Sequence, residues 1–156
     1  MPKFHDLVVF QRALDLSVQI YEITSSFPKQ ELYGLTAQLR RAAYGVVSNI
    51  AEGEGRLTFG ERRQFLSQAR GSLFEVEAQA LIAERLKFLS AADHARIDVA
   101  IQKTGRALIG YIRWVKKQED SAKPRHRATS QPITATPRST QPHPPAPAPK
   151  KRPPAT

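Results

Sequence analysis

The 156-residue sequence contains no cysteine, which excludes disulfide bonds, thiolate catalysis and cysteine-ligated zinc or iron–sulfur sites. It has no proline between Pro28 and Pro124, so the 95 residues in between lack the residue that most strongly breaks helices. No stretch shows the sustained alternation of polar and apolar residues that is typical of β-strands. The absence of proline from this region and of strand-like alternation favours a helical protein.

Long apolar runs and an apolar leader are also missing. The longest charge-free stretch before residue 119 is 42–51, which at ten residues is too short to span a bilayer. The first six residues lack the apolar segment of a secretory signal. We therefore expect a soluble protein that resides in the cytoplasm.

Proline and aromatic residues are distributed unevenly along the chain. Residues 119–156 hold ten of the twelve prolines and no glycine, whereas all twelve aromatic residues precede them. A segment so poor in large apolar side chains cannot bury enough surface to offset the entropy of folding. We predict a folded domain over 1–118 and a disordered, basic, proline-rich tail over 119–156. The net charge of +10 divides equally between the two parts.

The predicted domain contains four segments whose apolar residues recur every three or four positions, as in amphipathic helices. In the first, Leu7, Phe10, Leu14, Val18 and Tyr21 fall on one face, which Val9, Ala13, Leu16, Ile20 and Ile23 widen. The second covers about 35–50. Thr58 with Glu61 and Ser90 with Asp93 predict the starts of the third and fourth helices. Four helices joined by short loops predict an all-α fold, an antiparallel up-down-up-down four-helix bundle.

The fourth segment is strongly basic. Between 91 and 118 it has six basic residues and only two acidic ones, Asp93 and Asp98. Five basic residues share one face and form what we call the basic ridge: Arg96, Lys103, Arg106, Arg113 and Lys117. Arg63 and Arg70 of the third segment are expected to support it. Such a row can neutralise nucleic-acid phosphates regardless of base sequence, although the same residues could simply solvate the outside of a bundle.

The second segment carries a polar stripe opposite its apolar one. Its members are Gln38, Arg41, Gly45, Ser48 and Glu52, with Asn49 beside them. Small and polar groups on this side suit contact with a second subunit, and a solvated face is the alternative. Arg41 and Glu52 lie about three turns apart, so their partners must come from another helix or another chain. Glu77 of the third segment is a further candidate for such a polar contact.

The predicted domain lacks the common signatures of enzymes and metal centres. Di-iron bundles need Glu-x-x-His on two helices, and this tetrapeptide is absent. The phosphate loop Gly-x-x-x-x-Gly-Lys and the zinc motif His-Glu-x-x-His are absent as well. We therefore expect no catalytic residue, no metal and no cofactor. Glu75, Glu77 and Glu84 are expected to pair with Arg or Lys of other helices.

Four blocks of the sequence carry a family resemblance: Tyr33-Gly34-Leu35-Thr36, Arg40-Arg41-Ala42-Ala43, Asn49-Ile50-Ala51-Glu52-Gly53, and Gly71-Ser72-Leu73 with Glu75 and Glu77. Together they resemble the bacterial four-helix bundle family known as 23S rRNA intervening-sequence proteins, over about residues 5–118. The resemblance implies an antiparallel bundle that assembles into a homopentameric ring. It also implies kinship with accessory proteins of diversity-generating retroelements, which look like basic rings that bind nucleic acid and a reverse transcriptase.

We expect a non-enzymatic, oligomeric bundle that binds RNA or DNA through sequence-independent contacts between the basic ridge and phosphates. The alternative is a ring-forming scaffold that docks another protein, for example as an accessory subunit of a nucleic-acid enzyme. The ridge favours the first function, and the polar stripe of the second segment is compatible with both.

Overall fold

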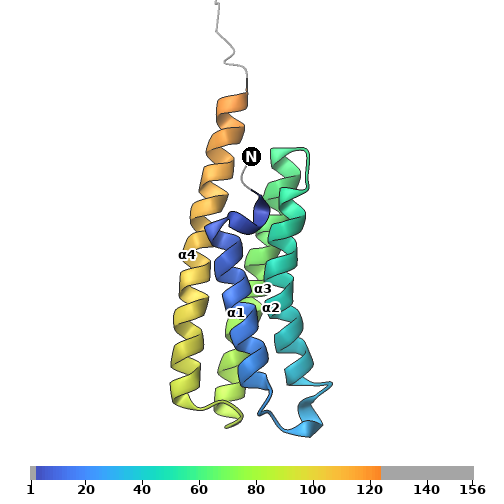
Figure 1. The fold of residues 1–156 in the computed structure, drawn as a ribbon, viewed down its shortest axis with the longest axis vertical. Coiled ribbons are helices and arrows are strands. Elements are labelled where there is room, and N and C mark those ends of the chain that lie inside the picture. The colour runs from blue at the N-terminus through green and yellow to red at the C-terminus, as the bar shows by residue number, and fades with distance from the viewer. Residues whose placement is uncertain (1–2, 124–156) are drawn as a thin grey trace, which may run out of the picture. The chain divides into compact units, whose positions relative to one another are not determined.

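A computed structural model of the chain describes residues 3–123, and these form an antiparallel four-helix bundle (Figure 1). A short 3₁₀ turn, η1 (Phe4–Asp6), leads into α1 (Val8–Thr24), and a second one, η2 (Lys29–Glu31), precedes α2 (Leu35–Glu54). The two longer helices are α3 (Phe59–Arg85) and α4 (Ala91–Ala122). The prediction of an all-α up-down-up-down bundle is confirmed.

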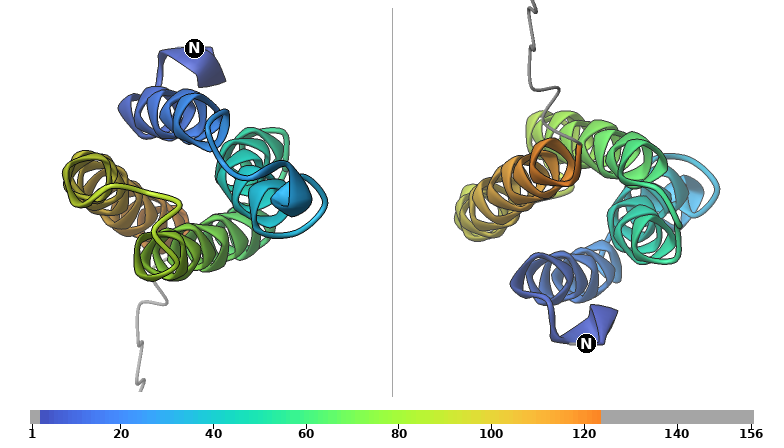
Figure 2. Two further views of the ribbon diagram at one scale, coloured as in Figure 1. Left: turned by 90° about the horizontal axis from the view of Figure 1, so that it is seen from below. Right: turned by 90° about the horizontal axis from the view of Figure 1, so that it is seen from above.

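The helices pack around a square in chain order, and α4 closes the square against α1 (Figure 2). Within residues 3–123 the core consists mainly of small and branched side chains together with Phe10 and Phe27, and its six buried alanines allow the helices to approach closely. Its largest fully buried members come from all four helices: Leu16, Ile20, Leu39, Val46, Ile50, Leu66, Val76, Ile97, Leu108 and Val115.

The buried stripe of α1 differs from the face that the sequence predicts first. Leu14, Val18 and Tyr21 are 40–51% exposed, whereas the residues expected only to widen that face are buried. The buried set is Val9, Phe10, Ala13, Leu16, Ile20 and Ile23. Both sets have helical spacing, so periodicity alone could not choose between them. The choice follows from the position of α1 between α2 and α4, which contact it from two sides.

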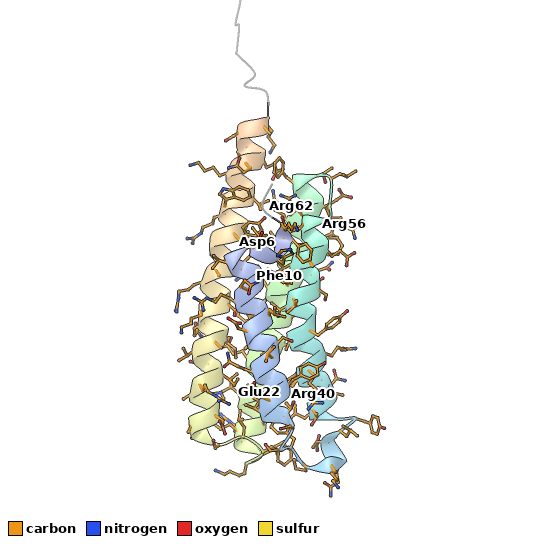
Figure 3. The ribbon with its side chains drawn as sticks, in the orientation of Figure 1. Asp6, Phe10, Glu22, Arg40, Arg56 and Arg62 are labelled. Carbon is orange, nitrogen blue, oxygen red and sulfur yellow. The ribbon has the colours of Figure 1, made fainter. Side chains whose placement is uncertain are left out.

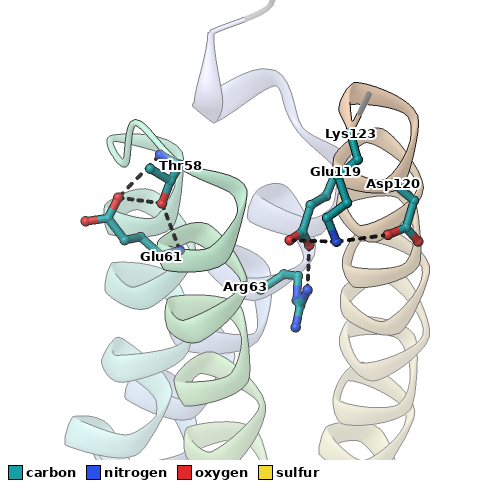
Figure 4. Close-up of polar contacts among 6 residues, drawn as sticks. All are labelled: Thr58, Glu61, Arg63, Glu119, Asp120 and Lys123. Carbon is teal, nitrogen blue, oxygen red and sulfur yellow. Dashed lines mark hydrogen bonds and ion pairs between the residues drawn. The ribbon is translucent and has the colours of Figure 1, made fainter. Parts of the chain in front are cut away.

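The starts of α3 and α4 agree with the predicted caps. The Thr58 hydroxyl accepts a hydrogen bond from the Glu61 backbone N–H at 3.2 Å, and the Glu61 carboxylate accepts one from the Thr58 N–H in return. Figure 4 shows this capping box. Hydrogen bonds from the Thr58 hydroxyl and backbone lower the pKa of Glu61. Ser90 caps α4 through the N–H of Asp93 at 3.0 Å.

The end of α4 lies beyond the predicted domain boundary. The helix continues to Ala122, so residues 119–122 are helical rather than part of a tail. The rest of the predicted disordered tail lies outside the described residues. Up to Lys123 the chain carries 18 basic and 14 acidic residues, a net charge of +4, and the remaining +6 belongs to the sequence that follows.

The turn between α3 and α4 contains one strained residue, Lys87, with φ of 63°. The N–H of Phe88 donates to the Ala83 carbonyl at 2.9 Å, and the N–H of Lys87 donates to the Glu84 carbonyl at 3.0 Å. This pair of hydrogen bonds is the Schellman motif, in which glycine usually occupies the left-handed position. A lysine in this position is destabilised relative to glycine because its Cβ lies close to the following carbonyl oxygen.

We expect Lys87→Gly to stabilise the bundle by about 1 kcal/mol, since glycine adopts this conformation without that cost. Thermal unfolding followed by circular dichroism should show a midpoint raised by a few degrees. Lys87→Ala, which removes the same charge but keeps the Cβ, serves as the control and should leave the midpoint nearly unchanged. Equal midpoints for the glycine and alanine variants would contradict the prediction.

Candidate nucleic-acid interface

All five residues of the basic ridge are exposed on α4. The side of the helix that faces the core is formed by Ile97, Ile101, Thr104, Leu108 and Val115. At 100° per residue the ridge lies on the opposite side of the helix. The same burial that fixes the rotation of α4 therefore turns the ridge toward solvent.

The middle of α4 carries no negative charge. From Val99 to Gln118 the helix has five basic residues and no acidic one. Within residues 3–123, no ion pair involves the four ridge residues of this stretch: Lys103, Arg106, Arg113 and Lys117. These four charges are therefore available to a negatively charged ligand.

The two ends of α4, by contrast, are neutralised by ion pairs. Arg96 lies 3.4 Å from Asp93, one turn earlier. Arg63 of α3 donates to the Glu119 carboxylate at 2.5 Å, and Lys123 lies 3.7 Å from the same residue (Figure 4). Arg63 was expected to support the ridge, and the structure instead places it in a bridge between α3 and α4. The charge available to a ligand is thus concentrated in the middle of α4.

Arg70 lies beside the ridge in a groove between α3 and α4. Its guanidinium sits over the Phe74 ring, 5.4 Å from the centroid. The groove has a volume of about 280 Å³, and its lining includes Arg70, Phe74, Glu77, Gly105 and Arg106. The structure therefore brings Arg70 and Arg106 to one groove. Glu77, a candidate for a subunit contact, lines the same groove.

The polar stripe of α2 is used in part within the protomer. A Cβ on Gly45 would lie 2.9 Å from the Ser72 hydroxyl of α3, so the absence of a side chain lets the two helices approach closely. The Asn49 amide donates to the Gly45 carbonyl at 2.8 Å, and the Ser48 hydroxyl donates to it at 3.4 Å. Glu52 pairs with Arg56, one turn later on the chain. These contacts supply an internal role for three of the five stripe residues and for Asn49 beside them.

The two remaining members of the stripe, Gln38 and Arg41, are exposed. Arg41 lies next to a surface that we call the tyrosine patch, formed by Tyr21, Leu32, Tyr33 and Tyr44. These four side chains are 49–89% exposed. Arg40, labelled in Figure 3, crosses from α2 to α1, where its Nε donates to the Thr24 hydroxyl at 2.7 Å and its guanidinium covers the Tyr21 ring.

A polar cluster that sequence reasoning missed joins three helices near the start of α3. The Tyr111 hydroxyl of α4 donates to the Glu54 carboxylate of α2 at 2.7 Å. Arg62 of α3 lies 3.6 Å from the same carboxylate oxygen and is labelled in Figure 3. The Trp114 ring stacks on Tyr111 with centroids 5.5 Å apart and 13° between the planes. Only the spacing of Tyr111 and Trp114, three residues apart on one helix, could have indicated part of this cluster.

The environment of Tyr111 favours its neutral form. Burial, followed by the hydrogen bond to Glu54 and the negative charge of that carboxylate, raises the pKa of Tyr111 well above its usual value near 10. Because the pKa is higher in the folded state, the folded protein binds this proton more tightly than the unfolded chain does. The stabilisation from Tyr111 is present below pH 10 and is lost as the pH rises toward the pKa of the folded state.

We expect Tyr111→Phe to reduce the loss of stability that the protein shows above pH 10. Denaturant unfolding of both proteins between pH 8 and pH 11 measures this, and the difference in unfolding free energy should shrink as the pH rises. The difference between their phenolate absorbance titrations should report one tyrosine that ionises well above pH 10. A difference spectrum that titrates at or below pH 10 would contradict the assignment.

The acidic residues of α3 do not form a metal centre within the described part of the chain, where no three His, Asp or Glu side chains cluster. Glu84 was expected to pair with Arg or Lys, and it lies 3.4 Å from His94 Nδ1 of α4 instead. Glu75 and Glu77 have no ion-pair partner among residues 3–123. The contact between Glu84 and His94 adds a polar link between α3 and α4 near their connecting turn.

The fold and this surface define a class of protein: an all-α four-helix bundle whose last helix presents an acid-free basic face. The chain belongs to the 23S rRNA-intervening sequence protein family, whose model matches residues 5–110. The match confirms the family that the sequence blocks indicate. The kinship with accessory proteins of diversity-generating retroelements stays a prediction.

A solved structure supports the fold. The chain is similar to a protein of unknown function from the S23 ribosomal protein family of Bacteroides thetaiotaomicron, with a TM-score of 0.61 and 20% identity over 67% of this chain and 98% of that one. None of the curated proteins matches the chain. Among residues 3–123, no helix has both the length and the apolar character needed to cross a membrane.

Proposed function

We propose that the protein is a non-enzymatic nucleic-acid-binding protein that holds RNA or DNA phosphates along the basic ridge of α4. The observation that carries this proposal is the acid-free middle of the helix, where Lys103, Arg106, Arg113 and Lys117 are exposed and form no ion pair among the described residues. Unpaired surface cations in a row attract a polyanion because binding releases its condensed counterions.

The spacing of the ridge suits an extended polyanion. Lys103 and Lys117 are fourteen residues apart, which corresponds to about 21 Å along a helix. One strand of a duplex places roughly six phosphates over that distance. The ridge thus offers several contacts to one strand and no arrangement that distinguishes one base from another. We propose that binding is independent of sequence and takes place in the cytoplasm.

A binding role agrees with the chemistry of the ridge. Exposed Lys and Arg neutralise phosphate charge, and the one carboxylate that shares a groove with a ridge residue, Glu77 beside Arg106, has no ion-pair partner or second carboxylate in that groove within residues 3–123. The Tyr111 hydroxyl, whose pKa burial raises, is committed to its hydrogen bond with Glu54. We therefore propose no catalytic residue and no cofactor.

Binding of a single-stranded RNA of mixed sequence should weaken as salt rises, with a slope of log affinity against log salt concentration that reflects the number of neutralised phosphates. Each phosphate contributes about −0.7 on single strands. We expect Arg106→Gln combined with Arg113→Gln to make the slope less steep by about 1.4. Fluorescence anisotropy of labelled RNA at four or five salt concentrations measures this change.

The matched control is Lys29→Gln combined with Arg85→Gln, which removes two exposed charges at the end of the bundle where α1 meets α2 and α3 meets α4. The control should leave the slope within error of the unmodified protein. Every variant retains the six basic residues that follow Lys123, so their contribution cancels in the comparison. Equal slopes for the ridge variant and the control would refute binding by the ridge.

A second candidate function, a ring-forming scaffold for protein partners, is supported by the tyrosine patch. Tyr33 and Tyr44 are 89% and 60% exposed and lie in a hollow of about 520 Å³ together with Arg40 and Arg41. Tyrosine and arginine are enriched in the energetically important centres of protein interfaces. We propose that this patch, with Gln38 and Arg41 beside it, contacts a neighbouring copy in a homo-oligomer, for which the family resemblance implies five copies.

Tyr33→Ala combined with Tyr44→Ala should lower the molar mass of the full-length protein in light scattering after nuclease treatment. Removing two aromatic anchors at an interface centre typically costs several kcal/mol of association free energy. Phe74→Ala is the control, because it removes an exposed aromatic ring from the groove between α3 and α4. A mass that both variants leave unchanged would exclude the tyrosine patch as the assembly surface.

A further inference from the structure

The only tryptophan of the chain, Trp114, lies on the exposed side of α4 among the cations of the ridge. It is 49% exposed, an unusual degree for so large an apolar side chain. Arg113 precedes it, and Lys117 follows one turn later. The ridge therefore contains an aromatic surface as well as positive charge.

One face of the Trp114 ring is held in place by Tyr111. It stacks on Tyr111 with 13° between the ring planes, and the Tyr111 hydroxyl is anchored on Glu54 at 2.7 Å. Glu54 is in turn 3.6 Å from Arg62, so groups from three helices fix the pair of rings. A ring held in this way loses little conformational entropy when a ligand packs against it.

Next to Trp114 lies a small apolar hollow between α1 and α4, with a volume of about 240 Å³. Leu7, Ala107 and Gly110 contribute to its lining. A Cβ on Gly110 would meet no atom within 4 Å, so packing within the protomer does not require glycine at this position. The hollow is smaller than the pockets of about 300–1,000 Å³ that hold drug-sized ligands, and it suits a single flat ring system.

We propose that Trp114 is a stacking platform for an unpaired base of single-stranded nucleic acid, with the base over Gly110 and its phosphates at Arg113 and Lys117. This inference rests on the proposed function and narrows its substrate class. Proteins that bind single strands without sequence preference combine a basic track with aromatic rings on which bases stack. In a duplex the bases stack on one another, so their faces cannot reach Trp114. Trp114 lies within the acid-free stretch of α4, and the Glu54 carboxylate behind it is bonded to Tyr111 and lies near Arg62, so the charge around the exposed ring favours a polyanion.

The test compares a mixed-sequence single-stranded RNA with a duplex of the same length and sequence, using the full-length protein. Trp114→Leu should weaken single-strand binding by about 5- to 150-fold, the range expected for one lost stacking contact, and should leave duplex binding unchanged. Trp114→Tyr, which keeps an aromatic ring, should retain most of the affinity. Because the chain has one tryptophan, single-stranded RNA should quench its fluorescence, and the duplex should not.

A second variant tests whether weaker RNA binding results from a blocked site or from a destabilised fold. Gly110→Leu fills the hollow beside Trp114 and replaces a poor helix former with a good one, so it should lower single-strand affinity without lowering the thermal midpoint. Gly71→Leu is the matched control, since its Cβ position on α3 is also open and lies off the ridge. The control should leave RNA binding unchanged.

The possible outcomes distinguish this inference from the proposed function. If neither RNA form binds, the proposed function fails and the stacking platform with it. If both forms bind and Trp114→Leu affects neither, the phosphate-binding ridge stands and the platform is overturned. The platform is also overturned if Trp114→Leu changes the molar mass in light scattering and spares RNA binding, because the ring then belongs to a contact between copies.

Discussion

The buried face of α4, four apolar side chains and one hydroxyl, sets the rotation of the helix that carries the basic ridge. Thr104 is fully buried in α4, and its single hydroxyl hydrogen is shared between the Arg12 carbonyl of α1 at 3.1 Å and the Ala100 carbonyl of its own helix at 2.9 Å. Rotation of α4 relative to α1 would remove the contact to Arg12 and leave the hydroxyl with the Ala100 carbonyl alone, and it would expose the buried side chains of Ile101 and Leu108 to water. The orientation that satisfies Thr104 is the one that faces Ile101 and Leu108 inward and the basic ridge outward.

The architecture follows from sequence patterns that are strong and local. Four runs of helical periodicity, separated by recognisable caps at Thr58 and Ser90, are sufficient to predict the order and direction of the helices. The buried face of α1 is not predictable in this way, because Leu14 and Leu16 belong to two stripes of similar character. Which one is buried depends on where α2 and α4 lie, and that is a property of the assembled bundle.

The candidate site is predictable to a lesser degree. The spacing of the ridge residues along α4 is a property of one helix, and the sequence contains it. The ion pair between Arg63 and Glu119 joins residues 56 positions apart, so no local sequence pattern could predict it. This ion pair removes Arg63 from the charges available to a ligand. The cluster of Tyr111, Glu54 and Arg62 needs three helices to be in place. Sequence reasoning thus finds candidate charges, whereas tertiary contacts decide which of them are free.

The acidic residues near the two ends of α4 have a consequence for the length of any ligand. Asp93 and Asp98 precede the acid-free stretch, and Glu119 and Asp120 follow it, so the stretch of about 30 Å is bounded by negative charge on both sides. Near both boundaries the basic side chains are paired with these carboxylates, Arg96 with Asp93 and Arg63 and Lys123 with Glu119, so they offer a polyanion less attraction than the middle of the helix does. For the proposed ligand, the acid-free stretch therefore sets an upper limit of about 30 Å on the length of strand that one bundle contacts along α4.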